Sequence, residues 1–344
     1  MSKKMDVRKV QLTGKSTYIV SLPRRWVDDV NLKRGETLNI FEQSDKSLLL
    51  VPKDVKKPEK ITEISVKVLP KEKPPSLVRK IVSLYLVGYN TIRLNAEHER
   101  MTLEQREKAK DFVRRMLVGT EIVADSKNEM VLQVLLSYPE LPVTDALRRI
   151  AIIATSMHKD AIYSLKESDN ELAEEVVRTD DEVDRFNFYI VRQLKAAVAD
   201  ETILKEIGLD NARDCLGYRL VTKSVERVSD HAVNIAKNSL AIKKPIDSAI
   251  FEVLAEMSSL AIAAFEDSIN SFFGKDYDCA DEVIERKGSV DICEEKAISQ
   301  ILEKKYDAET TSSLRLIVES IRRTAEYGSD IAEIVLNLTA LNKP

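Results

Sequence analysis

The chain has 344 residues, enough for two or three domains, and 44% of them are hydrophobic, as is ordinary for a folded protein. The composition argues against a membrane protein, a signal peptide and a disulfide or thiolate-zinc framework. No apolar stretch nears the roughly 18 residues of a membrane span, and the three cysteines lack CxxC spacing, so we expect a cytoplasmic protein without membrane insertion. The net charge of −4 is unevenly spread, +6 over residues 1–60 and −10 over the rest, which favours a polyanionic partner for the N-terminal region or a solvated basic surface there.

Residues 1–55 are predicted to form a small β-rich domain. Apolar and polar side chains alternate before Pro23, which ends that run, and Gly35 supplies a turn. The predicted elements are a strand over residues 18–22, a helical turn over 24–30, and strands over 37–41 and 47–51.

Residues 61–138 alternate between strand and helix signals and are predicted to form a small α+β domain. Ser76 is a candidate N-cap for a helix that ends near Leu86, and Thr102 with Gln105 has capping-box spacing for a helix that ends near Leu117. The pattern contains no site chemistry, so we expect a spacer or a dimer contact.

Residues 143–342 are predicted to be helical, because Pro245 is the only interior proline after Pro142. The segment also repeats internally. Residues 169–177 match residues 276–284 at a shift of 107, and residues 225–236 match residues 321–332 at a shift of 96. We therefore expect a pair of three-helix bundles, residues 143–243 and 246–342.

The N-terminal residues resemble domains of the AbrB/SpoVT/MazE type. The resemblance rests on Val7-Arg8-Lys9-Val10, Gly14-Lys15-Ser16-Thr17, Leu22-Pro23-Arg24-Arg25-Trp26 and Leu32-Lys33-Arg34-Gly35-Glu36. It implies a swapped-hairpin β-barrel dimer that binds DNA. The basic residues in this region could neutralise DNA phosphates and release counterions, or serve only as solubilising charge on a dimerisation domain. The candidate DNA-binding residues are Arg8, Lys9, Lys15, Arg24 and Arg25.

Carboxylates spaced by four mark two of the predicted helices. Asp180 and Asp184 share one helix face, and Glu226 and Asp230 share another, next to an apolar seam. If the two helices pack together, the four like charges repel unless a cation joins them, and oxygen ligands suit hard ions. Carboxylates at this spacing also occur on ordinary solvated helices.

The residues around these carboxylates resemble the PhoU family. The resemblance rests on Val225–Ala236 and, more weakly, on Thr179–Asp184. It implies two tandem three-helix bundles, metal clusters bound through E/DxxxD motifs, and regulation of phosphate uptake. The expected metal is iron, zinc, magnesium or manganese. The expected partners are DNA, a second copy of the chain, and phosphate transporter subunits or a signalling kinase.

The second repeat departs from the motif. Lys287 stands in the place of Asp180, and Arg322 stands in the place of Glu226. These cations would oppose a metal and could instead form ion pairs. The residues that remain as a weak second site are Asp291, Glu326 and Asp330.

The sequence therefore favours a non-enzymatic phosphate-response transcriptional regulator with a DNA-binding N-terminal domain and a metal-binding helical domain. The alternative is a protein-binding module that regulates a membrane transporter for phosphate or another ion without binding DNA. A metal-dependent phosphohydrolase is less favoured, because the chain shows no paired nucleophile and base and no Gly-rich phosphate loop.

His231 points away from the carboxylates on its helix and is expected to be a surface or packing residue.

Overall fold

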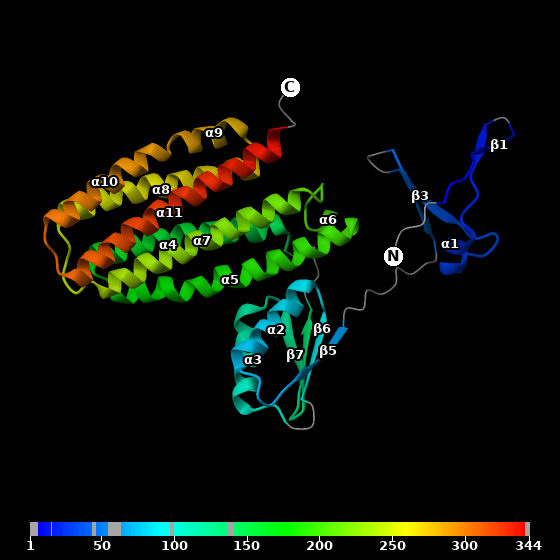
Figure 1. The fold of residues 1–344 in the computed structure, drawn as a ribbon, viewed down its shortest axis with the longest axis horizontal. Helices are drawn as coiled ribbons and strands as arrows, with labels where there is room; N and C mark the ends of the chain where they lie inside the picture. The colour runs from blue at the N-terminus through cyan, green and yellow to red at the C-terminus, as the bar shows by residue number, and fades with distance from the viewer. Residues whose placement is uncertain are drawn as a thin grey trace. The chain divides into compact units, whose positions relative to one another are not determined.

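The computed structural model describes residues 6–14, 16–42, 46–53, 63–96, 100–135 and 141–340. The chain divides into two compact units, residues 1–61 and residues 62–344 (Figure 1). The domain ends predicted at residues 55, 61, 138 and 342 fall outside the described residues.

The N-terminal unit contains two short hairpins and one helical turn. β1 (Gln11–Thr13) pairs antiparallel with β2 (Thr17–Ile19), and β3 (Leu38–Glu42) pairs antiparallel with β4 (Leu48–Pro52). α1 (Arg24–Asp29) lies between the hairpins in sequence. The hairpins are separate two-stranded sheets, so the described residues of one chain form no closed barrel. β1 was not predicted from the sequence, and β2 begins and ends before the strand expected over residues 18–22.

The N-terminal unit has almost no core of its own. Pro52 is the one buried residue among those described here. Large apolar side chains on both hairpins and on the chain before them are exposed: Val7, Val10, Leu12, Tyr18, Ile19, Val20, Ile40, Phe41, Leu48 and Leu49. So small a unit has little capacity to bury apolar surface within itself.

The second unit begins with a four-stranded sheet and two helices. The elements in chain order are β5 (Glu63–Val68), α2 (Pro74–Val87), β6 (Thr91–Ala96), α3 (Leu103–Met116), β7 (Thr120–Asp125) and β8 (Glu129–Val134). The strand order is β5-β6-β8-β7, with β5 parallel to β6 and the other pairs antiparallel. Apolar residues of the strands and of both helices form one small core.

The two helix starts differ in how well the sequence predicted them. Gln105 donates its backbone N–H to Thr102 Oγ1 at 3.2 Å and accepts from the Thr102 N–H at 3.0 Å, which confirms the capping box. The expectation for Ser76 is wrong, because α2 begins at Pro74 and its N-cap is Lys73. Proline suits the first helical positions, where no N–H partner is needed.

The helical body follows as two bundles of long helices. The first bundle holds α4 (Val143–Glu167), α5 (Asn170–Ala199), the short α6 (Glu201–Glu206) and α7 (Asp214–Ala241). The second holds α8 (Ser248–Gly274), α9 (Tyr277–Glu285), α10 (Lys287–Glu303) and α11 (Ala308–Thr339). The two bundles agree with the prediction, except that the middle helix of the second bundle breaks at Arg286 into α9 and α10.

One continuous hydrophobic core runs through both bundles. Figure 1 shows α7 and α11 side by side between α5 and the α8–α10 layer. Among the described helices, α8 is the one long and apolar enough to cross a membrane, but half of its most apolar window is buried within the bundle, as in the core helix of a globular protein.

A buried histidine joins the two bundles. His158 on α4 is fully buried, and its Nε2 lies 2.9 Å from the Ser258 hydroxyl on α8. Its Nδ1 lies 3.4 Å from the Thr324 hydroxyl on α11. Burial lowers the pKa of His158 to about 4, with smaller contributions from His231 and Lys159, so the ring is neutral at pH 7.

The small sheet domain is fastened to α5 by an arginine. Arg192 is 3% exposed and donates from its guanidinium to the backbone oxygens of Gly88 and Tyr89, at 3.3 and 3.0 Å, and to that of Tyr85. These carbonyls lie at the C-terminal end of α2, where a cation is electrostatically favoured. Arg115 on α3 adds an exposed ion pair to Asp181 on α5 at 2.6 Å.

Close packing of α8 against α11 depends on Gly328. A Cβ atom at this position would lie 3.0 Å from the backbone of Ala264 and Phe265. Gly328→Ala should therefore lower stability by about 1–3 kcal/mol, because backbone cannot move aside as a side chain can. Gly288→Ala is the matched control, since nothing lies within 4 Å of its Cβ position and alanine favours helix by up to about 1 kcal/mol. Urea unfolding measures both, and a stabilising Gly328→Ala would contradict the packing argument.

Candidate metal centre

Helices α5 and α7 bring the four predicted carboxylates of the first bundle near one another. Asp180 and Asp184 extend from α5, and Glu226 and Asp230 extend from α7. The pKa values show that the four charges interact. Burial, together with repulsion from Asp180, Glu226 and Asp230, raises the pKa of Asp184 to about 7.

Asp230 and Asp180 show the same effect of burial and repulsion. Burial, together with repulsion from Glu226 and Asp180, raises the pKa of Asp230 to about 6. Burial also raises the pKa of Asp180, although the adjacent Ser229 opposes this. Asp180 Oδ1 is buried without a hydrogen-bond partner, and the Ser229 hydroxyl donates to the backbone oxygen of Glu226 at 2.7 Å.

Lys223 is a cation inside this cluster that the sequence did not single out. It forms an ion pair with Glu226, three residues further along α7, whose side chain is only 12% exposed. Lys223 also lowers the pKa values of Asp184 and Asp230 by its charge. The ammonium group therefore offsets part of the repulsion that a metal ion would otherwise relieve.

The side chains fit a divalent cation in chemistry but not in their present arrangement. In the described part of the chain, no three His, Cys, Asp or Glu side chains are grouped closely enough to hold a metal ion. The unpartnered Asp180 oxygen and the raised carboxylate pKa values favour a cation from outside the protein. Binding one would require Lys223 to leave Glu226 and the carboxylates to close together.

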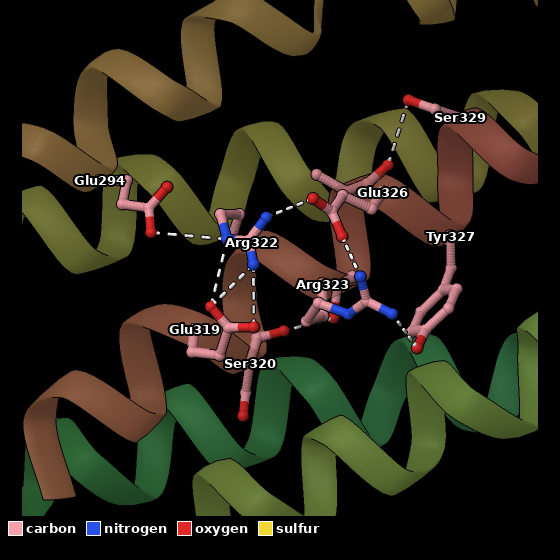
Figure 2. A network of polar contacts seen from close by, with 10 residues as sticks. Glu294, Glu319, Ser320, Arg322, Arg323, Glu326, Tyr327 and Ser329 are labelled. Carbon is pink, nitrogen blue, oxygen red and sulfur yellow. Dashed lines mark hydrogen bonds and ion pairs between the residues drawn. The ribbon is translucent and has the colours of Figure 1, made fainter.

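The corresponding place in the second bundle is filled by an arginine (Figure 2). Arg322 contacts Glu319 at 2.8 Å and Glu294 at 3.4 Å, and it pairs with Glu326. Glu326 is also paired with Arg323, so both oxygens of this partly buried carboxylate are engaged. Figure 2 shows Arg322 reaching across from α11 to Glu294 on α10.

The second bundle therefore does not gather the three carboxylates predicted for it. Asp291 and Asp330 are exposed, and Glu326 is bound by guanidinium groups. The described residues show no ion pair between Lys287 and Asp291. Glu294, which sequence reasoning missed, contacts the arginine instead. The shift of 107 residues places Glu294 opposite Asn187, and that substitution was the available signal.

His231 is a packing residue, in keeping with its predicted direction. Its ring lies 5.7 Å from that of Tyr327 on α11, tilted by 34°. Burial and the charge of Arg323 lower its pKa.

The predicted DNA-binding residues are surface residues wherever they are described. The side chains of Arg24 and Arg25 are 95% and 86% exposed, and their nearest carboxylates, Asp28 and Asp29, are 3.9 Å away. Arg8 pairs with Asp6 at 3.0 Å, and Lys9 is exposed. Lys15 lies outside the described residues.

Comparison with protein families gives two matches. The family model of the PhoU domain matches residues 147–239 and 254–335, which cover both helical bundles. The family model described as antidote-toxin recognition MazE, bacterial antitoxin, matches residues 11–58.

Curated relatives and solved structures agree with the first match. PhoU homolog 1 of Thermotoga maritima, a phosphate-specific transport system accessory protein, is 24% identical over 56% of this chain and 83% of its own length. The Xylella fastidiosa homolog of the same description is 25% identical over 44% of this chain. The match covers only 63% of the length of that relative. The structure of PhoU from Streptococcus pneumoniae matches 57% of this chain and 92% of its own, with a TM-score of 0.50 at 18% identity, and that likeness shows a shared fold.

Metal content should differ between the two bundles. We expect purified protein to carry metal that is lost in the double variant Glu226→Ala and Asp230→Ala. The control variant Glu326→Ala and Asp330→Ala removes the two carboxylates spaced by four that remain on α11 and should leave the metal content unchanged, because Arg322 occupies the position that corresponds to Glu226. Elemental analysis decides between these outcomes. Equal metal in wild type and in the Glu226/Asp230 variant would contradict the assignment.

The first-bundle cluster should also make metal-free protein sensitive to pH. The folded state holds the Asp184 proton more tightly than the unfolded chain does, so ionisation costs stability above about pH 7 and this cost fades towards pH 4. Asp184→Asn should stabilise metal-free protein by about 2 kcal/mol at pH 8, less than the full shift implies because the site is partly solvated, and by less at pH 5. Urea unfolding in EDTA measures this, with Asp210→Asn on an exposed loop as control. An equal gain at both pH values would contradict it.

Proposed function

Because the chain belongs to the PhoU family, whose model matches both of its helical bundles, we propose that it is an accessory regulator of phosphate transport. The observation that carries this proposal is the match of both repeats, together with the four carboxylates that α5 and α7 gather in the first of them. Its partners would be components of a phosphate transport system or a signalling kinase, and it would be located in the cytoplasm. We propose no enzymatic activity for it.

The helical body would bind a metal ion in the first bundle only. Asp180, Asp184, Glu226 and Asp230 would hold it, and iron, zinc, magnesium and manganese all accept carboxylate ligands. The cation would neutralise the repulsion that raises the pKa values of Asp184 and Asp230, and it would stabilise the folded form. In the second bundle Arg322 supplies the positive charge instead.

The N-terminal unit would bind DNA as a dimer. DNA binding is supported by the MazE-type match over residues 11–58 and by the net charge of +6 over residues 1–60. It is also supported by the exposure of the Arg24 and Arg25 side chains. The exposed apolar side chains of both hairpins support pairing with a second copy, in which interleaved strands could complete a barrel. Regulation of transcription would follow if DNA binding by the N-terminal unit is coupled to the regulatory role of the helical body.

DNA binding is tested with the intact protein and duplexes from its own promoter region. Affinity should fall at least about tenfold between 50 and 200 mM salt, because bound cations release counterions from DNA. Arg24→Ala with Arg25→Ala should lower it further, by about tenfold. The control Lys108→Ala with Arg114→Ala removes two exposed charges from α3 and should leave affinity unchanged.

Mapping of bound DNA in cells, with and without phosphate, extends this test to function. Occupied sites that change with phosphate would support transcriptional regulation. An empty map, together with no shift of any duplex at low salt, would refute DNA binding and leave regulation of a transporter by protein contact.

A further inference from the structure

A polar depression crosses the body between α7 and α11, and Asp180 and Asp230 of the proposed metal cluster lie on its wall. It has a volume of about 490 Å³, within the range of small-molecule sites. Its lining comes from three helices and is dominated by charged and aromatic side chains. The residues used below are Arg227, Lys237, His231, Arg323 and Tyr327.

The repeat explains why these side chains converge. At the shift of 96 residues, Arg227 matches Arg323 and His231 matches Tyr327. Because α7 and α11 pack side by side, matched positions of the two repeats face each other across the contact. The result is a tyrosine ring with two guanidinium groups over it, Arg323 at 4.9 Å and Arg227 at 5.5 Å from its centre.

The basic groups here keep donors available. No carboxylate of the described residues lies within 4.0 Å of the Arg227 guanidinium or the Lys237 ammonium group. Arg323 donates to the Tyr327 hydroxyl at 2.8 Å and pairs with Glu326, which leaves further N–H groups of its five. His231 Nδ1 is buried without a hydrogen-bond partner.

Carboxylates also line the depression, and their positions limit where a ligand can lie. Asp180 comes from α5, on the opposite side of α7 from Arg323 and Tyr327. Asp230 lies on α7 one turn before Asn234. An anion would therefore be repelled on the α5 side and attracted on the α11 side, where the two arginines meet.

We propose that this depression binds a phosphate-type oxyanion, either free or carried by a small molecule, with Arg227 and Arg323 as its principal contacts. Guanidinium groups match tetrahedral oxyanions through paired N–H donors, and a nearby lysine adds charge. This site uses side chains of both repeats, and because it shares Asp180 and Asp230 with the proposed metal cluster, its test is made on metal-free protein.

The test is isothermal titration of the intact, EDTA-treated protein with inorganic phosphate, sulfate and ATP. Saturable binding of at least one probe is expected, with an affinity at least tenfold weaker in Arg227→Gln. The control Arg178→Gln removes an exposed arginine on α5 and should change affinity less than twofold. Tighter binding of ATP than of phosphate would identify a carried phosphate group, and equal or tighter binding of phosphate or sulfate would identify the free anion.

Several outcomes would overturn the proposal. These are no saturable binding by wild type, unchanged affinity in Arg227→Gln, or an equal loss in Arg178→Gln, which would indicate unspecific attraction. Binding that appears only after metal is added back, and disappears in Asp184→Asn, would place the anion on the metal instead. Arg323→Gln removes the second principal contact and should weaken binding as well, but it also breaks the pair with Glu326. Its thermal transition is therefore measured first, and Arg227→Gln alone decides the outcome if Arg323→Gln does not fold.

Discussion

The packing of α7 against α11 is the constraint on which the helical body depends. Within each bundle, the helices bury apolar side chains against one another. Further apolar side chains of α7 and α11 pack together between the bundles, so that a single core runs through both repeats. Gly328 lets α8 approach α11 to backbone contact, and His158 ties three helices of the two bundles together. With these faces buried, the charged stripes of α7 and α11 lie outside the core, beside α5 and α10 respectively.

Two equivalent acidic clusters in this body balance their charge in different ways. In the second bundle Arg322 forms ion pairs with Glu319, Glu294 and Glu326, and Arg323 adds a second pair to Glu326 (Figure 2). In the first bundle Lys223 pairs with only one carboxylate, and burial keeps the pKa values of Asp184 and Asp230 high. The carboxylates of the first bundle are thus only partly compensated by positive side chains, whereas arginines compensate those around Arg322 in the second bundle.

Sequence periodicity predicted much of this arrangement and failed where local contacts decide. Repeat shifts gave the two bundles and the exchange of Glu226 for Arg322, because helical spacing fixes which face a residue occupies. Spacing does not choose between partners three and four residues away, so the pairing of Lys223 with Glu226 was missed. The contact of Glu294 on α10 with Arg322 on α11 was missed because it depends on how two helices pack, which spacing within one helix does not encode. The break at Arg286 and the start of α2 at Pro74 also depend on local backbone chemistry that the apolar pattern does not encode.

The lack of a buried core in the N-terminal unit has a consequence for how the protein responds to its own abundance. If a second copy of the chain covers these side chains, as proposed above, the stability of the N-terminal unit depends on the protein concentration. The helical body has its own core and would not share this dependence. Doubling the amount of a sparingly paired protein would then more than double the number of paired N-terminal units, so the expression level would itself regulate what those units bind.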